Sequence, residues 1–145
     1  MTTPIEPPVI TLPMGKILAA GIGVPTGILL GWLGVGAALG WSPETMVSGA
    51  WAAVLVSGPA VLCAGVLWRW KTGPIMRVCS MWMAASFGRF MVALIGAFLL
   101  YSAASLGPRP LLMALLIAFL ATLAAETSIV ARHIRRATIP APSSP

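Results

Sequence analysis

Residues 17–40 read "ILAAGIGVPTGILLGWLGVGAALG", a run without any charged side chain. A helix rises about 1.5 Å per residue, so this run can cross the roughly 30 Å hydrocarbon core of a bilayer. It is longer than the apolar region of a cleaved signal peptide, and only Lys16 supplies positive charge before it. We therefore interpret the run as a retained transmembrane helix.

Three further stretches have the same character, at 47–68, 78–103 and 111–131. Of the 145 residues, 59% are hydrophobic and only 8% are charged, and the mean hydropathy is +0.96. Soluble domains carry about 25% charged residues. The sequence therefore predicts an all-α membrane protein with four transmembrane helices. The loops between them are short, so consecutive spans are expected to be antiparallel neighbours.

The predicted membrane domain covers residues 15–136, with a tail at each end. Residues 1–14 are rich in proline and are expected to form a flexible, extended tail, and residues 137–145 are expected to be a second flexible tail. No β-strand is predicted.

Lysine and arginine are distributed unevenly between the two predicted sides of the membrane. With the N-terminus in the cytoplasm, the opposite side carries only Arg109, whereas the cytoplasmic side carries Lys16, Arg69, Lys71, Arg77, Arg132, Arg135 and Arg136. Positive charge accumulates in cytoplasmic loops. We therefore predict a multi-pass membrane protein with both termini cytoplasmic. The basic run at 132–136 is expected to touch anionic lipid headgroups, with a protein partner as the alternative.

Several functional classes are disfavoured by what the sequence lacks. The chain has no aspartate, three glutamates and one histidine, so no nucleophile–base set can be assembled and an enzyme is not expected. Cys63 and Cys79 with the single histidine are too few for a conventional zinc site, and no cofactor is predicted. The net charge of +6 lies at the ends of apolar runs, a pattern that does not indicate nucleic-acid binding.

Gly23, Gly27 and Gly31 recur every four residues and therefore share one face of the first span. Small residues at this spacing let two membrane helices approach closely. The face is expected either to pack against the other spans of the chain or to dock another subunit or a second copy.

Arg89 and Glu126 are the charged residues predicted to lie inside the hydrocarbon. Counted along each helix, Arg89 lies roughly 18 Å from Arg77 and Glu126 roughly 8–10 Å from Arg132. This offset is at the limit of two side chains, so an arginine extending toward the cytoplasm could meet the carboxylate, directly or through a water. Three roles stay open for these residues: a structural pair, a charge presented to a partner, or a polar path for ions.

Three segments carry a resemblance to a known family: "GVLWRWKTGPIMR" (65–77), "ASFGRFMVALIGAFLLYSA" (85–103) and "LLIAFLATLAAETSIVARHIRR" (115–136). They resemble ATP synthase protein I, a small four-span accessory protein of bacterial F-type ATP synthases. Relatives often carry Gly-Glu in the third span with a basic residue three positions later. Here Gly88 is followed by Arg89, Val92 takes the later position and the acid is Glu126 on the fourth span.

The resemblance implies a non-enzymatic assembly factor of the bacterial inner membrane that contacts the c subunits of the rotor ring, with ion or magnesium transport as a second role. Two other classes stay open from the residues. One is a small oligomeric channel or transporter for magnesium or protons, and the other is a structural subunit of a respiratory or photosynthetic complex. The expected partners are membrane lipid, other membrane subunits and a second copy of the chain.

Overall fold

The computed structural model describes residues 9–104 and 108–138 of the chain. It contains four long helices, α1 (Met14–Leu39), α2 (Pro43–Leu67), α3 (Ile75–Ala104) and α4 (Pro108–Thr138). Each is long and apolar enough to cross a membrane, so the predicted all-α multi-pass membrane protein is confirmed at this level. The predicted spans lie within these helices, which extend beyond them by one to seven residues, except that Gly40 and Trp68 lie just beyond the ends of α1 and α2.

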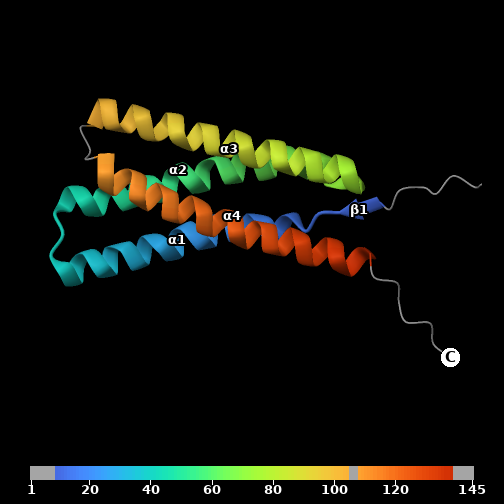
Figure 1. Ribbon diagram of the computed structural model, residues 1–145, viewed down its shortest axis with the longest axis horizontal. Helices are drawn as coiled ribbons and strands as arrows, with labels where there is room; N and C mark the ends of the chain where they lie inside the picture. The colour runs from blue at the N-terminus through green and yellow to red at the C-terminus, as the bar shows by residue number, and fades with distance from the viewer. Residues whose placement is uncertain (1–8, 105–107, 139–145) are drawn as a thin grey trace, which may run out of the picture.

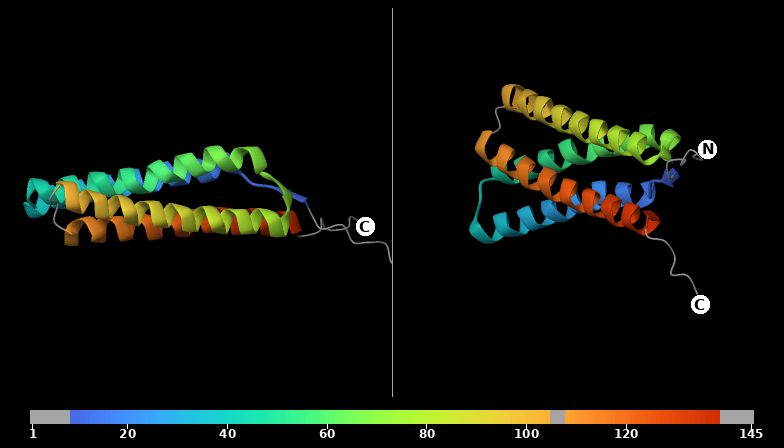
Figure 2. Two further views of the ribbon diagram at one scale, coloured as in Figure 1. Left: turned by 90° about the horizontal axis from the view of Figure 1, so that it is seen from above. Right: turned by 45° about the vertical axis from the view of Figure 1, so that its right-hand side comes forward.

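The helices form an elongated bundle in which α2 and α4 pack against each other, and α1 packs on both of them. The remaining helix, α3, lies mainly against α2, and it forms the edge of the bundle away from α1 (Figures 1 and 2). The start of α1, the α2–α3 connection and the end of α4 lie at the same end of the bundle (Figure 1). We call this the β-sheet end, after the small sheet described below.

Large apolar side chains cover the outside of all four helices, among them Leu30, Leu62, Phe98 and Leu120. A soluble protein rarely exposes apolar surface on this scale. The interior consists largely of alanine, in a cluster formed by Ala52, Val56, Ala93, Ala97, Leu111, Ala114, Leu115 and Ala118. Small interior residues let helix backbones approach closely, which is how membrane helices associate when lipid is as apolar as their side chains.

The predicted N-terminal tail is wrong for residues 9–13. Strand β1 (Val9–Thr11) pairs antiparallel with β2 (Thr72–Pro74), and Ile10 lies opposite Gly73. Ile10 and Leu12 are buried in an apolar cluster at the β-sheet end, which outweighs the preference of the nearby prolines for solvated backbone. Residues 1–8 and 139–145 of the two predicted tails lie outside the described residues. Residues 137 and 138, assigned to the C-terminal tail, belong to α4.

The turn between α1 and α2 is specified by local residues. Gly40 ends α1 in the left-handed region, with φ of 66°, which glycine adopts without a steric penalty. Ser42 caps α2, because its side chain accepts a hydrogen bond from the backbone N–H of Thr45, and Pro43 starts the helix. This capping fixes how α2 leaves the turn.

Trp32 of α1 packs closely against Gly49 of α2 near that turn. The indole Nε1–H of Trp32 donates to the backbone oxygen of Thr45 at 3.0 Å, and the ring lies in the space that a side chain on Gly49 would fill. Gly49→Ala should therefore lower the free energy of unfolding by about 1–3 kcal/mol, because the ring cannot yield as a flexible chain end does.

The control for this variant is Gly65→Ala on the same helix. Gly65 has open space at its Cβ position, and alanine is the better helix former by roughly 1 kcal/mol, so this change should be neutral or stabilising. Detergent-induced unfolding of the two purified variants measures the difference. An equal effect of both substitutions would exclude the Trp32 contact as the cause.

Candidate functional site: a buried ion pair between α3 and α4

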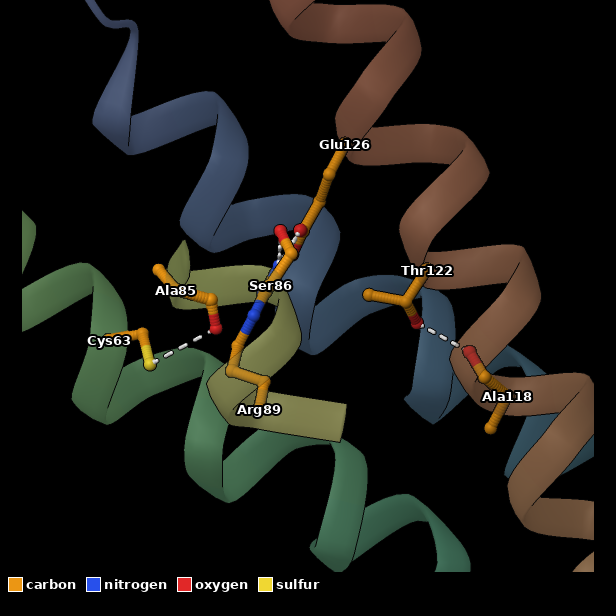
Figure 3. A network of polar contacts seen from close by, with 7 residues as sticks. All are labelled: Cys63, Ala85, Ser86, Arg89, Ala118, Thr122 and Glu126. Atoms are coloured by element: carbon orange, nitrogen blue, oxygen red, sulfur yellow. Dashed lines mark hydrogen bonds and ion pairs between the residues drawn. The ribbon is translucent and has the colours of Figure 1, made fainter. Parts of the chain in front are cut away.

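Arg89 of α3 and Glu126 of α4 form an ion pair within one chain (Figure 3). The guanidinium donates through Nη1 to Oε1 of Glu126 at 2.7 Å and through Nη2 to Oε2. Nη2 also contacts Oγ of Ser86, one turn nearer the β-sheet end, at 3.3 Å. Side chains of a helix lean toward its N-terminus, and Arg89 follows this direction, which closes the axial offset expected from the sequence.

The pair lies in the interior of the bundle. Glu126 is 0% exposed and Arg89 is 9% exposed. Burying an isolated charge there would cost free energy. The bidentate contact gives each side chain a counter-charge and hydrogen bonds. Glu126 is therefore the counter-charge that Arg89 meets within the chain.

Gly21 of α1 makes room for the carboxylate. A Cβ on Gly21 would lie 3.2 Å from Oε1 of Glu126 and 3.1 Å from Cβ of Ala60 on α2. All four helices thus converge at this point: α3 and α4 supply the charges, and α1 and α2 close over them. Sequence reasoning did not single out Gly21, because α1 is apolar on every side and its glycines give no signal of which face is buried.

Two further polar residues on the same face of α4 do not join the pair. Thr122 is buried beside Glu126, but its hydroxyl donates to the backbone oxygen of Ala118 on its own helix at 2.7 Å (Figure 3). His133 is seven positions after Glu126 and therefore falls on the same face of α4. It lies near the end of α4, in a separate cavity.

Two small cavities of about 10 Å³ each adjoin Arg89. One lies toward Thr122 and Glu126, and the other toward Cys63 and Trp82. Each has the size of about one water molecule. Nε of Arg89 is buried without a hydrogen-bond partner among the described residues. One water bound in either cavity could therefore serve as a hydrogen-bond partner beside Arg89.

The described residues contain no group of three histidine, cysteine or acidic side chains that could hold a metal ion. Cys63 and Cys79 are free thiols. The chemistry available at Arg89 and Glu126 is thus electrostatic and structural: the pair fixes the packing of α3 against α4.

Gly23, Gly27 and Gly31 lie on the outside of α1. All three are exposed, and a Cβ at any of them would meet nothing within 4 Å. The expectation that this face packs against the other spans of the chain is therefore wrong. The inward face of α1 is instead built from Met14, Ile17, Gly21, Pro25 and Gly36. Close helix contacts inside the bundle fall at Gly21, Gly36, Gly49 and Gly96.

Comparison with known proteins gives this chain no relative: no family model, no curated protein and no solved structure matches it.

Proposed function

We propose that this protein is a non-enzymatic accessory protein that binds other membrane helices through the outward glycine face of α1. The observation that carries the proposal is the open space at Gly23, Gly27 and Gly31. Gly34 has the same open surroundings and extends the face by one turn. A smooth strip of backbone facing lipid is the surface on which a second membrane helix packs most closely.

The position of the charges supports docking over ion transport. Arg89 and Glu126 bind each other, and the cavities beside them have about the volume of one water molecule each. A transport path ordinarily needs several ionisable groups or an interrupted helix that lines a cavity. The described part of this chain supplies a single closed pair within the spans.

We infer that the four spans alternate in direction across the bacterial inner membrane, with both termini in the cytoplasm. The support is the concentration of lysine and arginine at the β-sheet end, which carries Lys16, Arg69, Lys71, Arg77 and the basic residues of the last turns of α4. Such residues are retained on the cytoplasmic side during insertion.

The partner we propose is the membrane sector of an F-type ATP synthase, with the c subunits of its rotor ring as the contact. This part of the proposal rests on the resemblance to ATP synthase protein I. The c subunits of that family's complexes pack through small residues, which suits a glycine face on α1. Because Glu126 already neutralises Arg89, docking is assigned to the glycines, and the arginine holds the bundle together.

Recovery of the c subunits with the tagged protein tests both parts of this proposal. In the Gly27→Leu/Gly31→Leu variant, recovery should fall about tenfold or more, because two leucines hold the helices apart and forfeit their packing. Two single-substitution controls, Gly65→Leu on α2 and Ala124→Leu on α4, add similar bulk at exposed positions elsewhere and should leave recovery within about twofold.

The outcomes separate the interface from the partner. Unchanged recovery with the double variant would contradict the glycine face as the docking surface. Absence of c subunits from the wild-type preparation, with another membrane subunit recovered through the same face, would contradict the ATP synthase while retaining the interface.

A further inference from the structure

A second polar feature lies at the β-sheet end, between the start of α1 and the last turns of α4. An open cavity of about 200 Å³ is lined there by Pro13, Lys16, Ile129, Arg132, His133 and Arg136. The four residues from α4 follow the pattern i, i+3, i+4 and i+7, so they share the face of that helix that meets α1. The ion pair of Arg89 and Glu126 does not contribute to the lining, so this is a separate site.

The cavity gathers positive charge from two helices. Lys16 comes from α1, and Arg132 and Arg136 come from α4. Within residues 9–104 and 108–138 there are two carboxylate side chains: Glu44 lies in the first turn of α2, at the opposite end of the bundle, and Glu126 is bound to Arg89. The C-terminal dipole of α4 offsets only about half a charge. Three cations therefore converge without a counter-ion in the described part of the chain.

The shape of the site suits an anion with an apolar attachment. One water needs about 10–15 Å³, and the cavity is much larger than that, so it has room for a phosphate group. Each of the two guanidinium groups can donate two hydrogen bonds to phosphate oxygens. Lys16 adds a compact positive charge from the facing helix. Ile129 and Pro13 supply apolar walls beside the cations.

The location of the cavity indicates that the phosphate belongs to a lipid headgroup. The cavity lies where the apolar part of α4 gives way to its basic last turns, at the start of α1. In a helix that crosses a bilayer, we expect such a boundary at the depth of the lipid headgroups. Basic pockets between transmembrane helices at such a boundary bind the headgroups of anionic lipids. We propose that this cavity binds the phosphate of an anionic phospholipid and holds the lipid between α1 and α4.

Lipid titration of the purified full-length protein in neutral detergent tests the site, with native mass spectrometry counting the bound lipid. Phosphatidylglycerol is the probe and phosphatidylcholine the zwitterionic reference. Lys16→Gln/Arg132→Gln/Arg136→Gln should weaken phosphatidylglycerol binding roughly 100-fold, about fivefold for each cation removed. The charge-preserving Lys16→Arg/Arg132→Lys/Arg136→Lys should retain most of the binding.

The matched control removes the same charge at the same end of the bundle. Arg69→Gln/Lys71→Gln/Arg77→Gln takes three cations from the α2–α3 connection, outside the cavity, and should change binding by about twofold or less. Equal weakening by the two neutralising triple variants would overturn the proposal, since a diffuse surface charge would then explain the binding.

Two further results would overturn the lipid assignment. One is binding of phosphatidylcholine as tight as that of phosphatidylglycerol. The other is displacement of phosphatidylglycerol by an equal concentration of inorganic phosphate, which would make free phosphate the ligand. The expected result is that inorganic phosphate competes only in large excess. Far-UV circular dichroism of each variant verifies that the helices are retained.

Discussion

Arg89→Ala is expected to lower the free energy of unfolding by about 3–5 kcal/mol, because it leaves the carboxylate of Glu126 buried without a counter-charge. Reversible unfolding in mixed detergent micelles measures the change. Arg77→Ala is the control: Arg77 is an exposed cation on the same helix, and its loss should cost less than about 0.5 kcal/mol.

Removal of both charges should cost much less than removal of one. The double variant Arg89→Met/Glu126→Leu fills the site with apolar side chains and should recover most of the lost stability, since replacing a buried ion pair is often nearly neutral. The corresponding double-mutant cycle should therefore give a coupling of about 3 kcal/mol or more, because each single substitution leaves one charge buried and the double variant does not. Additive effects of the two single substitutions would contradict a direct pair.

Gly21→Leu is expected to have the second large effect, lowering the free energy of unfolding by about 3 kcal/mol or more. The new side chain must displace Ala60 of α2 and push the carboxylate of Glu126 away from Arg89, so overpacking and partial loss of the pair act together. The same unfolding assay measures the effect.

Gly23→Leu is the matched control, two residues farther along α1. A Cβ on Gly23 meets nothing within 4 Å, so the isolated protein should tolerate leucine within about 0.5 kcal/mol. Similar destabilisation by Gly21→Leu and Gly23→Leu would mean that the faces of α1 are assigned incorrectly.

We assign different roles to the two faces of α1: the inner face stabilises the bundle and the outer face docks a partner. Gly21 on the inner face lets Glu126 and Arg89 meet at the centre of the bundle, which settles how the four helices pack. Gly27 and its neighbours on the outer face remain free in the single chain. Stability and docking should therefore respond to different substitutions on one helix.

The spans could be predicted because their lengths and compositions depend only on bilayer thickness. The pairing of Arg89 with Glu126 could also be anticipated, since a charge within the membrane needs a counter-charge and the spans offered these two. The buried face of α1 could not be predicted. Lipid is as apolar as a protein core, so a membrane helix lacks the hydrophobic periodicity that marks the inner face of a soluble one.

The other features that sequence reasoning missed depend on residues far apart in the chain. Ile10 and Leu12 become buried only because β1 meets β2, some sixty positions later. The cavity of Lys16 and Arg136 likewise joins the beginning and the end of the described helices. Local composition identifies a proline-rich tail and a basic cluster, and it contains no information about these long-range contacts.

Site-specific photo-crosslinking in native membranes tests the central claim most directly. A photoreactive residue is introduced at Gly27, and, as the reference, at Gly65, which is equally open but lies on α2. The docking account predicts a discrete adduct with a membrane subunit from position 27 and only lipid adducts from position 65. Absence of a protein adduct at position 27, or the same adduct at both positions, would contradict docking through the glycine face of α1.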